Sequence, residues 1–240
     1  MNTPPVALFR RTTAWSFSAL FALMLAGALA AKESPPLVPG AEIKLAGSKG
    51  KFDFLNVDPV RHRLLAAHEK DETADFFDLD SNTLLARVKT GPAVCVVLDS
   101  KTGNYFVSVQ DDKRIALIDS ATLKETGSIA VEGETDAILF DPKDNRLYVT
   151  HDNGKSVWAI DMDSQKVVAT IAIPGAPECM DYDSTTDRIY LNIKDTNEVA
   201  VIDVKTNAVV DHWPTAPAVG PHGLAFDAES VRDSYRTRLC

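Results

Sequence analysis

The segment DNRLYVTHDNGKSVWAID, residues 144–161, decides the fold because its pattern returns further along the chain. The stretch DRIYLNIKDTNEVAVID, residues 187–203, repeats the tyrosine, the polar break and the closing Ile-Asp pair. Each stretch holds two short runs rich in Val, Ile and Tyr, the composition of β-strands, separated by residues that form turns. The recurrence predicts a repeated β module rather than a single hairpin.

Two ladders of aspartates give the period of the repeat. The first ladder follows the first apolar strand of each unit and consists of Asp58, Asp99, Asp141, Asp183 and Asp227. The second closes the third strand of each unit and consists of Asp78, Asp119, Asp161 and Asp203. Both advance by 41 to 44 residues, and four short strands in about 42 residues are typical of a β-propeller blade. A helical or leucine-rich repeat would need a 3.6-residue apolar stripe, which these units lack.

The residues RLYVTHDNGKSVWAIDMDSQKVVATI, 146–171, closely resemble the YVTN β-propeller repeat of the YncE-like group. The resemblance extends over about residues 41–230 and implies an all-β propeller of four-stranded blades. Family members resemble seven-bladed rings, which at about 42 residues a blade need about 294 residues. We therefore expect about four full blades plus partial ones, in units near 48–91, 92–133, 134–175, 176–220 and, incomplete, 221–240.

The two ends of the repeat region depart from the family pattern. AEIKLAG, residues 41–47, is expected to form an outermost fourth strand, and PHGLAFD, residues 221–227, the inner strand of a fifth unit. The pattern stops at DSYRTRLC, residues 233–240. We interpret this as truncation of a seven-bladed ring, with a compact four- or five-bladed ring as the competing arrangement. Unpaired blade edges would favour self-association.

The first thirty-one residues have the layout of a secretory signal peptide. They carry no acidic residue, and Arg10 and Arg11 precede an apolar run over residues 17–31. That run is shorter than the roughly 20 residues a spanning helix needs, which disfavours a membrane anchor. The arginine pair also suggests twin-arginine export, although the following Thr-Thr-Ala lacks the usual pattern. We expect a periplasmic or secreted propeller domain over residues 32–240, without a membrane span after cleavage.

The formal net charge of −9 opposes nonspecific attraction to phosphate backbones and anionic lipid. Nucleic acid is therefore a disfavoured partner, although a local basic patch could override the overall charge. The expected partner is a small ligand or a protein of the cell envelope.

Ionisable residues recur five positions before the aspartates of the first ladder. These positions hold Asp53, Val94, Asp136, Glu178 and His222. The following positions on the same face are apolar in every unit, beginning with Leu55 and Val57, as expected around a buried strand. The propeller resemblance places the start of the inner strand at the mouth of a central channel, so we expect an acidic rim with one imidazole there. The alternative is that such positions are polar simply because they border loops.

Two histidines occupy equivalent places ten residues after the ladder, His68 and His151. They could join the rim as ligands or proton carriers, or they could be solvated loop residues. Cys95 and Cys179 also occupy equivalent places, two blades apart, which we expect to be too far for a disulfide.

The chain contains no nucleophile elbow, phosphate-binding glycine loop, close-spaced metal motif or recognisable cofactor motif. We therefore expect a non-catalytic binding or scaffold propeller that recognises its ligand or partner at the channel-mouth loops. The alternative is an enzyme, because lactonase-like and quinoprotein-dehydrogenase propellers have similar repeats and a rim of Asp, Glu and His could hold a metal or act as a base.

Overall fold

The computed structural model describes residue 40 and residues 42–227 of the 240-residue chain. Residues 42–227 belong to one compact unit, in which the regular structure is β-strand apart from a single 3-10 turn, η1 (Glu69–Asp71). Within this part of the chain no helix has the length and apolar character needed to cross a membrane. The expected signal peptide and the segment 233–240 lie outside the described residues.

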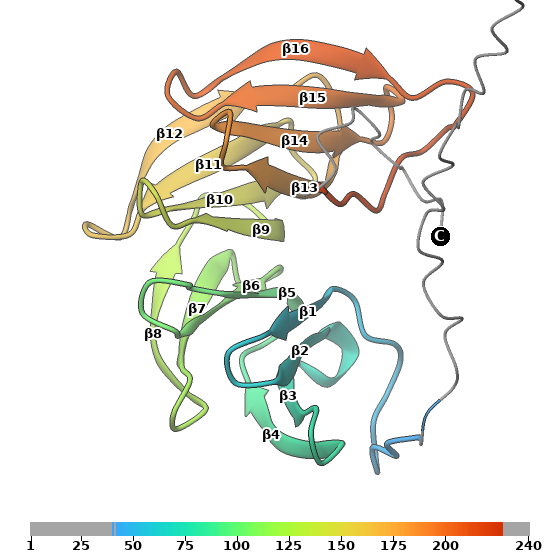
Figure 1. Ribbon diagram of the computed structural model, residues 1–240, viewed down its shortest axis with the longest axis vertical. Helices are drawn as coiled ribbons and strands as arrows, with labels where there is room; N and C mark the ends of the chain where they lie inside the picture. The colour runs from blue at the N-terminus through green and yellow to red at the C-terminus, as the bar shows by residue number, and fades with distance from the viewer. Residues whose placement is uncertain (1–39, 41, 228–240) are drawn as a thin grey trace, which may run out of the picture. The chain divides into compact units, whose positions relative to one another are not determined.

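Four antiparallel sheets of four strands follow one another along the chain (Figure 1). Blade 1 consists of β1 (Leu55–Asp58), β2 (Arg63–His68), β3 (Thr73–Asp78) and β4 (Thr83–Lys89). Blade 2 consists of β5 (Ala93–Leu98), β6 (Tyr105–Val109), β7 (Arg114–Asp119) and β8 (Lys124–Ala130). Blade 3 consists of β9 (Thr135–Asp141), β10 (Arg146–His151), β11 (Ser156–Asp161) and β12 (Lys166–Ala172). Blade 4 consists of β13 (Pro177–Asp183), β14 (Arg188–Ile193), β15 (Glu198–Asp203) and β16 (Ala208–Pro214).

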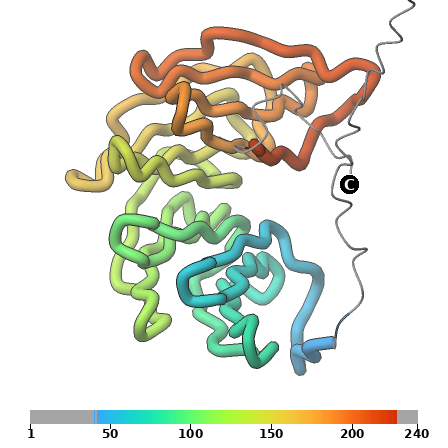
Figure 2. Tube along the Cα trace, in the orientation of Figure 1, coloured from blue at the N-terminus to red at the C-terminus, as the bar shows by residue number. Residues whose placement is uncertain are grey.

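Each strand of a blade pairs with the next strand in sequence, as in a meander. The tube in Figure 2 follows the chain through the four sheets in turn. Together with the structural comparisons below, this confirms the predicted fold class: the protein is an all-β propeller built from four-stranded blades.

The aspartate ladders are turn caps. The Asp58 carboxylate accepts hydrogen bonds from the backbone N–H groups of Val60 and Arg61 at 2.9 and 3.1 Å. The Asp161 carboxylate accepts from the backbone and hydroxyl of Ser164 at 2.8 and 2.7 Å. Such bonds satisfy backbone donors that the sheet leaves unpaired at a turn. Several of these turns close with a left-handed residue just before the next strand, for example Asn145 at φ 52°, a conformation that asparagine tolerates well.

Three apolar clusters fill the space between successive blades. Phe76 and Tyr105 belong to the cluster between blades 1 and 2, and Phe106 and Ile160 to that between blades 2 and 3. The cluster between blades 3 and 4 contains Tyr148 together with the inward side chains of β14 and β15. Burying a side chain of this size contributes about 1.5–3 kcal/mol, so packing between blades is the main stabilising interaction.

Two expectations about the ends of the repeat need correction. Residues 42–47, within the expected outer strand, form no strand, and residues 221–227 form none either. The second segment nevertheless packs on blade 4. The backbone N–H of Phe226 donates to Asp181 Oδ2 at 2.7 Å, and the Asn192 side chain donates to the carbonyl oxygens of His222 and Gly223 at 3.0 and 3.1 Å.

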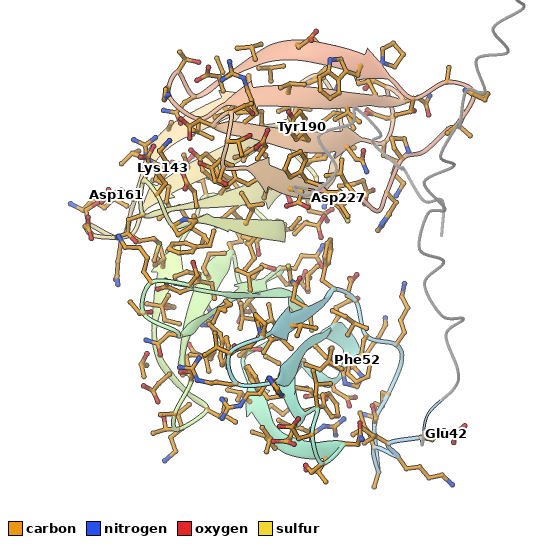
Figure 3. The ribbon with its side chains drawn as sticks, in the orientation of Figure 1. Glu42, Phe52, Lys143, Asp161, Tyr190 and Asp227 are labelled. Atoms are coloured by element: carbon orange, nitrogen blue, oxygen red, sulfur yellow. The ribbon has the colours of Figure 1, made fainter. Side chains whose placement is uncertain are left out.

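These bonds use side chains rather than a backbone ladder, which explains why segment 221–227 lies where an inner strand is expected without being one. Its residues Leu224 and Phe226 pack against the cluster that contains Tyr190 on blade 4. Figure 3 labels Tyr190 in this blade and Asp227, the last residue of the segment.

The expected burial of the inner strand fails in blade 1. Leu55 and Val57 are each 53% exposed, whereas Val96, Ile138 and Met180, at the register of Leu55 in the other blades, are buried. The difference arises because those three side chains face the preceding blade, and no blade precedes blade 1 among the described residues.

Candidate functional site at the mouth of the inner strands

Four of the predicted site residues interact where the inner strands begin, namely Asp53, Asp136, Glu178 and His222. Glu178 is the second residue of β13 and is 9% exposed. One of its carboxylate oxygens lies 2.8 Å from Lys194 Nζ, and the other lies 3.0 Å from His222 Nε2. The hydrogen bond and the charge of Glu178 raise the pKa of Lys194. Glu178 therefore joins the end of β14 to segment 221–227 through charged contacts.

Asp136, the second residue of β9, lies close enough to this group for the charges to interact. Burial, followed by the negative charges of Asp152, Glu178 and Asp53, raises the pKa of Asp136 to about 7. Its carboxylate accepts a hydrogen bond from the backbone N–H of Ala137, which opposes part of this rise, and it forms no ion pair with another described residue. A carboxyl group that is partly buried among like charges holds its proton to unusually high pH.

Asp53 precedes β1 and contributes to the same group from blade 1. Burial raises the pKa of Asp53, partly opposed by the positive charge of Lys51, while Glu69 and Glu178 raise it further. Carboxylates from blades 1, 3 and 4 thus influence one another. The blade 2 position is filled by Val94, as the sequence requires.

Sequence reasoning missed a second set of residues at this mouth. They stand eleven positions after the first ladder and are Glu69, Gln110, Asp152 and Lys194. The Gln110 side-chain amide donates to Asp152 Oδ2 at 2.7 Å, which links blades 2 and 3. All four residues are polar, so this recurring polar position could have been recognised in the sequence one residue after His68 and His151.

His68 does not join this group through its contacts. It is 1% exposed, at the end of β2. Its Nδ1 lies 3.3 Å from Asp75 Oδ2, and its Nε2 lies 2.8 Å from the carbonyl oxygen of Lys49. Its ring packs against Phe52, with centroids 4.6 Å apart. His68 therefore anchors the chain before β1 to the end of β2 and is not a solvated loop residue.

His151 occupies the equivalent place in blade 3 and also has packing contacts. Its ring stacks on Trp158 with centroids 4.6 Å apart, and its Nδ1 lies 3.3 Å from Ser156 Oγ. Gly133 and Gly154 flank it so closely that a Cβ on either would lie within 2.2 Å of a ring nitrogen. The ring needs both glycines in order to fit, so His151 has a structural role.

The two cysteines of the described residues are free thiols. Burial, followed by the nearby charges of Asp136 and Glu178, raises the pKa of Cys179 to about 12. Burial also raises the pKa of Cys95, and neither thiol is activated as a nucleophile. Within residues 42–227 no group of His, Cys, Asp and Glu has an arrangement that could hold a metal ion.

No protein-family model matches the chain, and no curated protein matches it. Among solved structures, the chain is similar to hydrazine synthase of Kuenenia stuttgartiensis, with a TM-score of 0.63 and 15% sequence identity over 79% of this chain and 55% of the other. It is also similar to the dihydro-heme d1 dehydrogenase NirN in complex with DHE, with a TM-score of 0.53 and 13% identity over 68% of this chain and 37% of the other.

Both solved structures contain β-propellers. At these identities the likeness establishes the fold alone. The chain also spans only 55% and 37% of the two proteins it matches.

Proposed function

We propose that this protein is a non-catalytic binding propeller that recognises a cationic group at the mouth of its inner strands. The observation that carries the proposal is the crowding of negative charge around Asp136. Burial is the largest cause of its raised pKa, and repulsion from Asp152, Glu178 and Asp53 raises the pKa further. A bound ammonium or guanidinium group would relieve that repulsion and form charge-assisted hydrogen bonds. The ligand class is an amine or a basic side chain of a partner protein.

The carboxylates of the site differ in whether they have a cationic partner within the protein. Glu178 is paired with Lys194 and contacts His222, whereas Asp136 forms no ion pair with a described residue. A cationic ligand is therefore expected to contact Asp136 first. Because binding favours the ionised carboxylate, it should release a proton near pH 7 and strengthen as the pH rises.

The cellular setting of this function is part of the same proposal. The basic and apolar layout of residues 1–31 supports export to the periplasm or beyond. The repeat at residues 146–171 supports membership of the YncE-like group. An exported binding propeller would meet its amine ligand or basic partner in the cell envelope.

The test is a titration of the full chain with putrescine as probe, followed by calorimetry at pH 6 and pH 8. We expect saturable binding that is tighter at pH 8 and at least tenfold weaker in Asp136→Asn. Asp144→Asn is the matched control because Asp144 is an exposed acid in the turn between β9 and β10, at the far end of those strands. Binding that is absent, or equal in wild type and Asp136→Asn, would refute the proposal.

The second candidate is an enzyme of the lactonase or quinoprotein-dehydrogenase type. One observation favours it: a carboxyl group whose pKa lies at about 7 is suited to general base catalysis at neutral pH. Thermal melts with calcium, magnesium and zinc, followed by a lactone-hydrolysis screen, separate the two candidates. A metal-dependent rise in Tm and hydrolysis lost in Asp136→Ala and His222→Ala would favour the enzyme, and an unchanged Tm without hydrolysis would favour the binding protein.

A further inference from the structure

Two register positions lie at the mouth in every blade, and in blade 4 they carry opposite charges. They stand five positions before and eleven positions after the aspartates of the first ladder. The pairs are Asp53 and Glu69 in blade 1, Val94 and Gln110 in blade 2, Asp136 and Asp152 in blade 3, and Glu178 and Lys194 in blade 4. Lys194 is therefore the one cation among these eight residues.

The pair in blade 4 shows how an ammonium group fits this mouth. Lys194 Nζ lies 2.8 Å from a carboxylate oxygen of Glu178. At the same two positions of blade 3 a carboxylate faces a carboxylate, and the charge of Asp152 follows burial as a cause of the raised pKa of Asp136. Blade 4 thus contains internally the contact that blade 3 offers to a ligand.

The two partners of this ion pair differ in burial. The Glu178 side chain is 12% exposed, whereas the Lys194 side chain is 55% exposed. A buried carboxylate that loses its cation is strongly destabilised. An ammonium on a flexible four-carbon stem regains water when it leaves such a contact. Glu178 therefore needs a cation, but that cation can be exchanged.

The surroundings of the pair stay in place when the lysine leaves. The backbone N–H of Lys194 donates to the carbonyl oxygen of Ala176 at 2.9 Å. The backbone N–H of Ala176 in turn donates to Asp195 Oδ1 at 2.8 Å. The second oxygen of Glu178 lies 3.0 Å from His222 Nε2, which keeps the carboxylate oriented. Exchange requires only that the Lys194 side chain turns outward.

Lys194 also interacts with the carboxylates that a ligand would use. After the larger effects of Glu178, the charges of Asp136 and Asp152 raise the pKa of Lys194. A ligand cation that approaches Asp136 is therefore repelled by the ammonium of Lys194.

We propose that Lys194 is a tethered cation that occupies the mouth when no ligand is bound and limits how tightly a free amine binds. The inference rests on the amine site proposed above and adds the residue that sets its affinity. A bound amine takes over the contact with Glu178, and the Lys194 side chain turns into solvent. Only a ligand whose contacts with Asp136 and Glu178 outweigh the lost ion pair displaces the lysine.

The test is chemical rescue of the full chain by putrescine at pH 8, above the pKa of Asp136 at about 7. Without ligand, Lys194→Ala should have a lower Tm than wild type because Glu178 loses its nearest cation. Calorimetry should show that this variant binds putrescine about fivefold or more tightly than wild type. Putrescine should accordingly raise the Tm of Lys194→Ala by more than that of wild type.

Lys155→Ala is the matched control for the loss of one positive charge. Lys155 lies in the same loop as Asp152, and its ammonium donates to the carbonyl oxygen of Pro174 at 3.3 Å. Its removal should change putrescine affinity by less than about twofold. Lys194→Arg, which keeps the cation, should bind putrescine no more tightly than wild type. Lys194→Gln, which keeps the aliphatic stem, replaces Lys194→Ala if that variant does not fold.

The outcomes separate this inference from the amine site itself. Equal putrescine affinity in wild type and Lys194→Ala, or an equal gain in Lys155→Ala, would overturn the tethered cation and leave the amine site standing. No binding by either wild type or Lys194→Ala would refute both. Binding by Lys194→Ala alone would support the tethered cation while refuting recognition of putrescine by the wild type. Rescue by the uncharged 1,4-butanediol as well would overturn the inference, because the contact with Glu178 requires a positive charge.

Discussion

Blades 1 and 4 place different chemistry at the same register positions. In blade 4, Ile193 at the end of β14 and Ala200 in β15 lie on the face toward blade 3. Both are 0% exposed within an apolar cluster. In blade 1 the equivalent residues are His68 and Asp75, which are just as buried but hydrogen-bonded to each other. Blade 3 covers the first pair, whereas residues 48–52, before β1, contact the second through His68.

Blades 2 and 3 show two further solutions at these positions. Blade 2 has Val109 and Ala116 in the cluster shared with blade 1, and blade 3 stacks His151 on Trp158. The repeat therefore accommodates either apolar packing or a hydrogen-bonded polar pair at the positions equivalent to His68 and Asp75. The segment packed against these positions decides which arrangement is stable, because a loop segment with unpaired backbone groups, such as residues 48–52, needs polar partners.

The largest effect is expected where one blade covers another. Ile193→Ala should lower the free energy of unfolding by about 2–5 kcal/mol, because it opens a cavity in the cluster between blades 3 and 4. Chemical denaturation followed by tryptophan fluorescence measures the change. A loss below about 1 kcal/mol would mean that blade 4 is not packed as described.

The His68–Asp75 pair should be nearly as sensitive. His68→Val, which installs the blade 2 residue, should cost about 1–3 kcal/mol because Asp75 keeps its burial and loses a partner. His68→Val/Asp75→Ala, the complete blade 2 pair, should recover part of that loss in the same denaturation assay. A double variant that is less stable than the single one would contradict the view that the two solutions are interchangeable.

A smaller and pH-dependent effect is expected at Asp136. Its pKa lies near 7 in the folded protein and near 3.8 in the unfolded chain, so the folded state binds the extra proton between these values. Wild-type stability from this group is therefore greatest below about pH 4 and is lost as the pH rises to 7. Asp136→Asn should gain stability relative to wild type on the order of 1 kcal/mol between pH 4 and pH 8, after allowance for solvent screening.

Melting curves at matched ionic strength provide the measurement for Asp136→Asn. Asp144→Asn should show the same difference from wild type at both pH values. An Asp136→Asn difference that is constant across the range would show that this carboxyl titrates normally.

The smallest effect is expected on the uncovered face of blade 1. Leu55→Ala removes a side chain that is 53% exposed and should change the free energy of unfolding by about 0.5 kcal/mol or less. The same assay applied to Met180→Ala, at the same register in blade 4, should give a loss of about 2 kcal/mol or more. Equal losses at the two positions would indicate that the face of Leu55 is covered in solution.

The fold followed from the sequence because turn chemistry and strand composition repeat at a fixed step. The site followed only in part. The clustering of Asp136, Glu178 and His222 could be predicted because the ladder fixes where each inner strand starts. The roles of His68 and His151 could not, because the same register position contacts residues 48–52 in blade 1 and Trp158 in blade 3.

The caps of the second ladder have a consequence for acid denaturation. Hydrogen bonds from the residues that follow lower the pKa values of all four carboxyls, namely Asp78, Asp119, Asp161 and Asp203. Their contribution is therefore present above about pH 4 and is lost as the pH falls through the lowered values. Since every blade carries the same protonation-sensitive corner, acid should loosen all the sheets over one narrow interval instead of detaching them one at a time.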